Sequence, residues 1–172
     1  MCFSKSRQVV LQIWDDKIDL PDENGAPVSP DIPCNLVSLL KVRDGRLEWT
    51  QVMRSNDIFR GIPYDFVQFT CLQEIFAGWL GVGLGSYCHV SDSLHAYERD
   101  LKNILAASAV APSEDTSSLA LPLSDSEKVF QDLAHSVERI IDHDTSPADL
   151  LAALNGCRLP TAYKDMLAVL TA

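Results

Sequence analysis

A pair of strand-like runs on either side of the dipeptide Asp44-Gly45 is the feature that most restricts the fold of this chain. Asp-Gly is a preferred pair for the two-residue turn of a β-hairpin, because both turn residues need positive φ. The runs at 35–43 and 46–53 are therefore predicted to pair as strands. A wide apolar stripe over Tyr64–Leu80 predicts a helix that is buried on most sides. Ser86–His95 is predicted to return as a further strand.

The rest of the chain completes a mixed α/β (α+β) pattern with a helical C-terminal tail. Gln8–Trp14 is β-branched and apolar and predicts a buried strand. Composition shifts to Ala, Ser, Pro and Thr over 108–123, which we interpret as a linker between a core at 1–107 and a helical region at 124–172. The remaining predicted elements are a surface loop at Asp15–Pro33, a loop or short helix at Arg54–Pro63, and helices at Ala96–Ala107, Ser124–Asp142, Ser146–Asn155 and Pro160–Leu170.

The bulk composition is that of an ordinary globular protein. With 172 residues, of which 47% are hydrophobic and 22% charged, the chain can form one domain with a sizeable core. Its net charge of −10 disfavours nucleic-acid binding, because phosphate contacts need a basic face. A small anionic ligand held by a few arginines remains compatible with this charge.

The cysteines and the hydropathy of the chain indicate in which cellular compartment the protein is expected. The five cysteines are odd in number and lack metal-type spacing, so we expect no metal site and a reduced, cytoplasmic protein. The start of the chain has no apolar segment typical of a signal peptide. The most apolar segment, Phe66–Val82, carries Gln73 and Glu74, and we interpret it as a buried helix rather than a membrane span.

Two groups of residues before the predicted helix could carry chemistry. Cys34, where the long loop meets a strand, is either a nucleophile activated by a nearby cation or a small buried hydrophobic residue. Arg54 and Ser55 could together hold a phosphate. The alternative is that this segment begins a helix, with Ser55 or Asp57 as its cap and Arg54 in solvent.

Histidines form the last group of candidates. His95 and Tyr97 are two residues apart at the end of a strand and therefore share a face. Both side chains could hydrogen-bond a sugar hydroxyl, or they could form an ordinary half-buried pair. The other histidines have no partner pattern, and we interpret them as structural or exposed: His89, His135 and His143.

The candidate residues belong to longer sequence blocks that follow one another in a fixed order. The blocks are Ser6-Arg7-Gln-Val-Val-x-x-x-Trp14, Asp31-Ile-Pro-Cys34, Met-Arg54-Ser-Asn-Asp57-x-x-x-Gly61-x-Pro63-Tyr-Asp65, Leu72-Gln-Glu and His95-x-Tyr97. In this order and spacing the chain resembles the thymidylate synthase family, over more than half of its length. The resemblance implies an α/β fold with a mixed sheet and a central helix, and a homodimer in which the sheet packs against its twin.

The resemblance assigns a role to each residue around the nucleophile. Cys34 is implied to be the thiol that adds to C6 of a pyrimidine. Arg54 is implied to bind the nucleotide phosphate and to help keep Cys34 as thiolate, and Ser55 to assist at the phosphate. Asp57 is implied to face the folate pterin and to offer a backbone amide to the base.

The remaining implied roles concern the sugar, the folate and the partner subunit. His95 and Tyr97 are implied to hold the ribose hydroxyl, and Gly61 to let the backbone approach the ligands closely. Arg7 matches an arginine that family members lend to the phosphate site of the partner subunit. The chain departs from the family pattern at two positions, where a second arginine and a histidine are usual: Gln8 and Asn35.

The reaction that the resemblance implies is a folate-dependent alkylation of C5. Addition of the Cys34 thiolate at C6 makes C5 a nucleophile, which attacks the one-carbon unit of 5,10-methylenetetrahydrofolate. Hydride transfer from the folate then gives a methyl group, whereas capture of water gives a hydroxymethyl group. The expected substrate is a pyrimidine nucleoside monophosphate.

Asp65 bears on the choice of base. Thymidylate synthases carry asparagine at this point, whose amide can donate to O4 and accept from N3–H of uracil. An ionised aspartate only accepts, which suits the 4-amino group of cytosine and resembles the cytidylate hydroxymethylases of the family. We therefore expect dCMP or CMP rather than dUMP. The alternative is that Asp65 caps the helix that follows it.

The resemblance begins at Ser6, without the long N-terminal region of family members. That region carries another phosphate arginine, a glutamate that organises proton transfer and a tryptophan near the folate. Nor is the closing C-terminal segment recognisable in Leu159–Ala172. Since a general acid or base contributes about 10²–10⁴-fold in rate, we expect this chain alone to be slow or inactive. The competing hypothesis is a truncated, non-catalytic remnant that binds nucleotide or dimerises.

Overall fold

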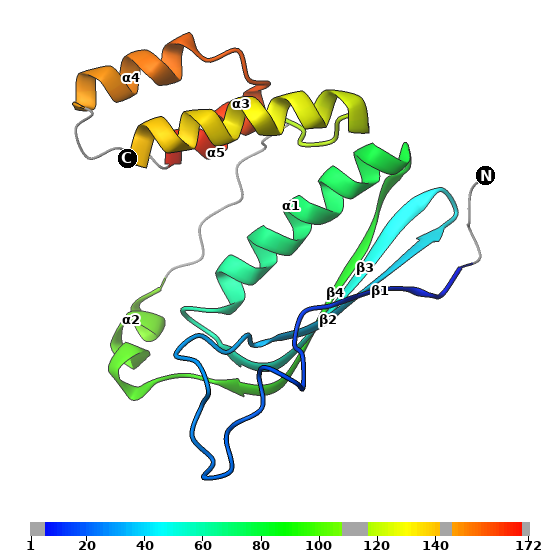
Figure 1. Ribbon diagram of the computed structural model, residues 1–172, viewed down its shortest axis with the longest axis vertical. Coiled ribbons are helices and arrows are strands. Elements are labelled where there is room, and N and C mark those ends of the chain that lie inside the picture. The colour runs from blue at the N-terminus through cyan, green and yellow to red at the C-terminus, as the bar shows by residue number, and fades with distance from the viewer. Residues whose placement is uncertain (1–5, 108–116, 142–145, 170–172) are drawn as a thin grey trace. The chain divides into compact units, whose positions relative to one another are not determined.

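The computed structural model of the chain describes residues 6–107, 117–141 and 146–169 (Figure 1). The chain divides into two compact units, one formed by Met1–Gln73 and Val82–Pro112 and the other by Glu74–Gly81 and Ser113–Ala172. Helix α1 (Ile62–Leu80) contributes its first turns to one unit and its last turns to the other. The described residues contain no helix that is both long and apolar enough to cross a membrane.

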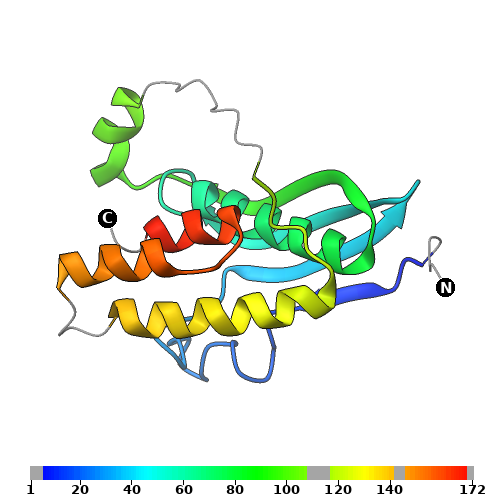
Figure 2. The ribbon, with the colours of Figure 1, turned by 90° about the horizontal axis from the view of Figure 1, so that it is seen from above.

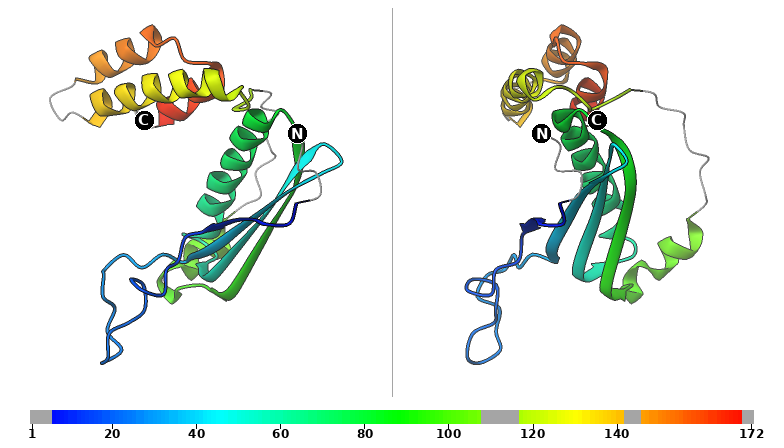
Figure 3. Two further views of the ribbon diagram at one scale, coloured as in Figure 1. Left: turned by 45° about the vertical axis from the view of Figure 1, so that its right-hand side comes forward. Right: turned by 90° about the vertical axis from the view of Figure 1, so that its right-hand side faces the viewer.

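A four-stranded mixed sheet forms the first unit, as expected. Its order is β1-β2-β3-β4, in which β1 pairs antiparallel with β2, β2 antiparallel with β3, and β3 parallel with β4. Helix α1 connects the parallel strands and lies against one face of the sheet (Figure 3). The strands are β1 (Val9–Gln12), β2 (Asn35–Arg43), β3 (Arg46–Asp57) and β4 (Gly83–His95).

The β2–β3 hairpin turns at Asp44-Gly45, and this prediction is confirmed. Asp44 has φ 49° and Gly45 has φ 71°, the positive values that a tight hairpin turn requires. Strand β3 continues to Asp57, four residues beyond its predicted end. Its last residues pair with β4, which returns from elsewhere in the sequence. The predicted loop or short helix at Arg54–Pro63 was therefore wrong for its first four residues.

The core of this unit lies between the sheet and α1. Leu40, Leu47, Trp49 and Met53 are buried on the strands, and the Trp49 and Phe69 rings approach to 6.2 Å between centroids. These contacts position α1, because its buried stripe must face the sheet.

Backbone contacts add to this packing where β4 enters the sheet. Buried Gln73 donates from Nε2 to the Leu47 carbonyl at 2.7 Å. A Cβ at Gly85 would lie 2.8 Å from the same carbonyl oxygen, so β4 approaches β3 closely only because this residue is glycine.

Two expectations about burial were wrong. Strand β1 is exposed along its whole length, since among the described strands it is an edge strand that pairs with β2 alone. Helix α1 is buried on one stripe rather than on most sides, and Tyr64 and Val67 remain 73% and 64% exposed.

The second unit is helical, in agreement with the predicted tail. Segment 117–122 runs along the last turns of α1, where the Glu74 carboxylate accepts from Ser118 Oγ (2.6 Å) and from the Leu119 amide (3.1 Å). The Leu119 carbonyl in turn accepts from the buried Tyr163 hydroxyl at 2.7 Å. The helices are α3 (Leu123–Ile141), α4 (Pro147–Gly156) and α5 (Thr161–Val169), which lie side by side (Figure 2).

Residues between the sheet and this helical unit are only partly described. A short 3-10 helix, η1 (Glu98–Asp100), and helix α2 (Leu101–Ala106) follow β4, where a helix at 96–107 was predicted. The predicted linker at 108–123 falls partly on residues 108–116, outside the described residues. The division into regions at 1–107, 108–123 and 124–172 stays a prediction.

Candidate active site

Cys34 lies at the bend between the long loop and β2, and it is exposed. Its carbonyl accepts from the amide of Arg54 at 2.9 Å, so the residue is fixed beside β3 at the end of β2 that is opposite the hairpin turn. The interpretation of Cys34 as a small buried hydrophobic residue does not fit this exposure. No disulfide forms among the described cysteines, which leaves Cys34 a free thiol.

The Arg54 side chain lies against the backbone that leads to Cys34. Its Nε donates to the Pro33 carbonyl at 3.0 Å, and its Nη2 donates to the Ile32 carbonyl at 3.3 Å. A guanidinium has five N–H donors, so these bonds hold the cation in place while leaving donors for an anion. Arg54 and Ser55 lie in β3, which excludes the alternative that they begin a helix.

Asp57 closes the turn between β3 and α1. Its Oδ1 accepts from the amides of Phe59 (2.8 Å) and Arg60, and its carbonyl accepts from the Gly61 amide at 3.0 Å. Its Oδ2 is buried and has no hydrogen-bond partner within the described residues. A buried carboxylate oxygen without a donor is costly, and such atoms in native sites commonly face a ligand or water.

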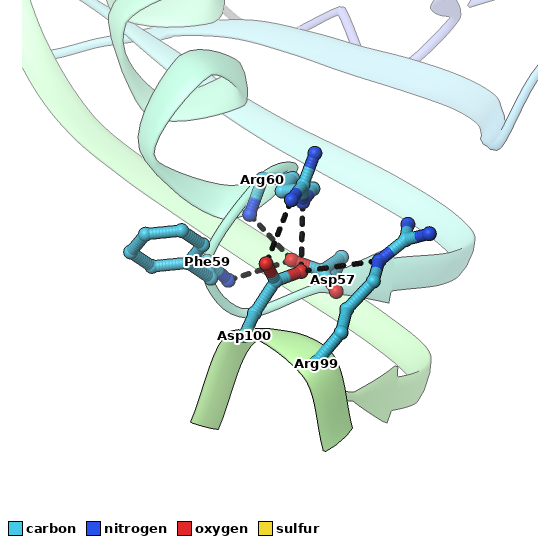
Figure 4. Close-up of polar contacts among 5 residues, drawn as sticks. All are labelled: Asp57, Phe59, Arg60, Arg99 and Asp100. Carbon is cyan, nitrogen blue, oxygen red and sulfur yellow. Dashed lines mark hydrogen bonds and ion pairs between the residues drawn. The ribbon is translucent and has the colours of Figure 1, made fainter. Parts of the chain in front are cut away.

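A bidentate ion pair ties this turn to the segment after β4 (Figure 4). Arg60 donates from Nε and Nη2 to the two carboxylate oxygens of Asp100, each at 2.7 Å. Asp100 is 2% exposed, whereas Arg60 is 57% exposed. The hydrogen bond from Arg60 lowers the pKa of Asp100, and the same bond raises the pKa of Arg60. No local sequence signal marks this pair, because forty residues separate its partners.

A second polar group lies where the first turn of α1 meets the end of β3 and the middle of β4. Asn56, which is 4% exposed, donates from Nδ2 to Asp65 Oδ2 at 2.8 Å. The same nitrogen lies 3.0 Å from His89 Nε2, and His89 Nδ1 lies 2.8 Å from the Tyr87 hydroxyl. We call these four residues, Asn56, Asp65, Tyr87 and His89, the Asn56 cluster. Burial lowers the pKa of His89, while the Asp65 carboxylate opposes this shift more weakly. Burial raises the pKa of Tyr87.

The Asn56 cluster bears on two interpretations made from the sequence, and it agrees with a structural role for His89. His89 has specific polar partners, although it showed no partner pattern in the sequence. Asp65 lies inside the first turn of α1, which begins at Ile62, so it is not the residue that caps this helix. Asn56 and Tyr87 were given no role from the sequence, because they come from different strands and meet only through His89.

His95 and Tyr97 lie at the same end of the sheet as Asp57. His95 is the register partner of Asp57, and its carbonyl accepts from the Ile58 amide at 2.9 Å. The His95 and Tyr97 rings meet edge to face at 5.2 Å between centroids, and the Arg99 guanidinium lies 4.8 Å from the Tyr97 centroid. The two predicted sugar-binding residues therefore stand beside the turn that Asp57 closes.

Arg7 is the one candidate that lies far from this group within the chain. It is exposed just before β1, and the preceding carbonyl of Ser6 accepts from the Arg43 guanidinium at 3.2 and 3.3 Å. Arg43 is next to the hairpin turn, whereas Cys34 is at the opposite end of β2. The fold thus assembles Cys34 with Arg54, and Asp57 with His95, but it leaves Arg7 apart.

Comparison with known proteins gives the family. The family model for thymidylate synthase matches residues 4–149. The chain belongs to the thymidylate synthase family. This confirms the resemblance drawn from the sequence blocks, and the mixed sheet and helices described above are consistent with a thymidylate synthase-like fold.

Individual relatives within the thymidylate synthase family cover different parts of the chain. The deoxyuridylate hydroxymethyltransferase of Bacillus phage SP01 is 38% identical over 96 residues, which are 55% of this chain and 24% of that protein. A putative thymidylate synthase of Methanocaldococcus jannaschii is 34% identical over 103 residues, 58% of this chain and 44% of its own. The thymidylate synthase of Leuconostoc mesenteroides is 24% identical over 151 residues, 83% of this chain and 41% of its own. The chain thus spans less than half the length of these relatives.

Proposed function

We propose that the protein transfers a one-carbon unit to C5 of a pyrimidine nucleoside 5′-monophosphate. The observation that carries this proposal is the exposed Cys34 thiol, which directly follows the two residues whose carbonyls hold the Arg54 guanidinium. A cysteine attacks through its thiolate, which is the nucleophilic form. Family membership supports the same reaction class, because the relatives bear the names thymidylate synthase and deoxyuridylate hydroxymethyltransferase.

In the proposed mechanism each side chain has a limited task. The Cys34 thiolate forms a bond to C6, and the displaced electron pair makes C5 nucleophilic. Arg54 and Ser55 hold the phosphate from the end of β3, and the Asp57 amide meets the base. His95 and Tyr97 hold the sugar hydroxyl.

The folate is proposed to occupy the turn at the end of β3. When bound, 5,10-methylenetetrahydrofolate supplies the one-carbon unit that C5 receives. Asp57 Oδ2 fits such a ligand, because it is a buried acceptor in need of a donor and pterin rings carry N–H donors. Gly61 closes the same turn, and its lack of a side chain keeps the turn tight.

We propose a cytosine nucleotide, dCMP or CMP, as the pyrimidine. Asn56 donates a hydrogen bond to Asp65 Oδ2, whereas Asp65 Oδ1 has no hydrogen bond within the described residues. A carboxylate oxygen is an acceptor and suits a 4-amino group better than the O4 of uracil. This choice differs from the base in the names of the phage relatives, so it needs a direct test.

A homodimer is proposed from the exposed face of the sheet. Val37, Val52 and Val90 form a cross-strand row on the face away from α1, and Val90 is 44% exposed. An apolar row of this kind is stabilised when a second sheet covers it. Arg7, which lies apart from its own Cys34, is proposed to reach the phosphate site of the other subunit. The reaction is proposed to take place in the cytoplasm.

A covalent-adduct experiment tests this function. We expect a 5-fluoropyrimidine nucleotide and methylenetetrahydrofolate to form an adduct that mass spectrometry of peptides assigns to Cys34. Cys34→Ser should abolish the adduct, and Cys88→Ser, which changes another exposed cysteine, should retain it. A folded protein that forms no adduct with either the cytosine or the uracil analogue would contradict the proposed reaction.

A further inference from the structure

The amide of Asn56 is held on three sides by three different segments. Asp65 of α1 accepts from it, His89 of β4 faces the same nitrogen, and Gly61 of the turn lies behind its oxygen. An ideal Cβ at Gly61 would be only 2.1 Å from Asn56 Oδ1. The side chain is almost fully buried, so its orientation is set by these neighbours and not by solvent.

The distances within the Asn56 cluster show which atoms carry the hydrogen-bonding protons. An ionised carboxylate only accepts hydrogen bonds, so the Asn56 atom 2.8 Å from Asp65 Oδ2 is the amide nitrogen. That nitrogen also lies 3.0 Å from His89 Nε2. Because Asn56 Nδ2 is a donor, His89 Nε2 must be unprotonated and accept. A neutral His89 then carries its proton on Nδ1, where the Tyr87 hydroxyl oxygen accepts at 2.8 Å.

We infer that Asn56 is a positioning residue for base recognition. Its amide is held in one orientation by His89 in the Nδ1–H tautomer, and the Tyr87 hydroxyl oxygen favours this tautomer by accepting from Nδ1. Asn56 occupies one oxygen of Asp65 and leaves the other for the base, so it selects a 4-amino over a 4-oxo pyrimidine by acting through Asp65. Phe66 stacks on the His89 ring at 5.1 Å between centroids and holds it in this plane. The inference rests on the proposed function, in which Asp65 reads the base.

The first arm of the test is independent of any ligand. Long-range proton–nitrogen NMR of the full chain labelled with ¹⁵N-histidine distinguishes the two neutral tautomers, and His89→Gln assigns the resonances. We expect His89 as the Nδ1–H tautomer at neutral pH, and Tyr87→Phe to shift it toward the Nε2–H form. Finding His89 as the Nε2–H tautomer in the unmodified protein would overturn the inference, because two donors would then face each other.

The second arm measures the binding of dCMP and dUMP by calorimetry. Asn56→Ala should weaken dCMP binding by roughly tenfold, the size expected for a lost hydrogen bond to a charged group, with little change for dUMP. Thr50→Ala, on the same strand but outside the cluster, should leave the ratio of the two affinities unchanged. An unchanged ratio in a folded Asn56→Ala variant would overturn the inference. If Asn56→Ala does not fold, Tyr87→Phe replaces it, with a smaller expected loss of the same preference.

Asp65→Asn separates the two proposals. If Asp65→Asn leaves the dCMP to dUMP ratio unchanged, the base-reading function itself fails. If Asp65→Asn changes the ratio and Asn56→Ala does not, only the positioning role of Asn56 fails. Parallel loss of preference in both variants, together with the Nδ1–H tautomer of His89, is the expected result.

Discussion

Gly61 is the position at which the site can least accommodate an added side chain. A Cβ there would lie 2.1 Å from Asn56 Oδ1 and 3.0 Å from the Asp57 carbonyl oxygen. We expect Gly61→Ala to displace Asn56 and to lower the free energy of unfolding by about 1–3 kcal/mol, the usual cost of overpacking. Urea denaturation measures this loss. Gly83→Ala is the matched control, because its Cβ would meet nothing closer than 3.6 Å and should change stability little.

The protonation of His89 makes the stability of the folded protein depend on pH. Its pKa is lowered mainly by burial, so the folded protein binds fewer protons at this site than the unfolded chain. Stability from this source is present above the ordinary histidine pKa of 6.5 and declines as the pH falls through the lower folded pKa. Denaturation midpoints between pH 7 and 5 should therefore fall less in His89→Gln than in the unmodified protein. Equal slopes would contradict this assignment.

At the scale of elements, the turn after β3 depends on the Arg60–Asp100 pair. Removing Arg60 leaves the buried Asp100 carboxylate without its bidentate donor, which is more costly than losing a surface ion pair. We expect Arg60→Ala to lower Tm clearly. Arg99→Ala should have little effect, because Arg99 is 67% exposed and 3.7 Å from Asp100. Thermal unfolding followed by circular dichroism compares the two, and an equal effect would show that the pair does not hold the turn.

Local elements could be predicted from the sequence, whereas their lateral contacts could not. Asp44-Gly45 specified a hairpin, and the apolar stripe specified α1, because turn chemistry and periodicity act over a few residues. The parallel pairing of β3 with β4 leaves no local signal, so the contact of Asn56 with His89 and the Arg60–Asp100 pair were both missed. Burial of β1 was predicted wrongly, because apolar residues do not reveal an edge position.

At the scale of the whole molecule, the row of Val37, Val52 and Val90 predicts self-association, because it is apolar and Val90 is exposed. We expect sedimentation velocity to show a dimer. Val90→Lys should shift it toward monomer, because two charged groups would then face each other at the interface. Lys102→Ala, on α2 rather than on the sheet, serves as the comparison and should retain the dimer. A monomer at every concentration of the unmodified protein would contradict the proposed dimer.

The sequence predicts the family of the chain, but not what each residue of the candidate site contacts. The ordered blocks around Cys34, Arg54 and Asp57 gave the family, which the match over residues 4–149 confirms. What each block contacts depends on folding: the carbonyls that anchor Arg54 lie twenty-one and twenty-two residues earlier in the chain. The assigned roles of these residues stay predictions.

We propose that Cys34, by adding to C6, starts the reaction at C5 of a nucleotide whose base Asp65 selects. Release of tritium from 5-tritiated dCMP, CMP and dUMP, in the presence of methylenetetrahydrofolate, measures both parts in one assay. We predict release from a cytosine nucleotide in preference to dUMP, with the preference reduced in Asp65→Asn and all release lost in Cys34→Ser. Release from dUMP alone, or from no nucleotide by a folded protein, would contradict the account.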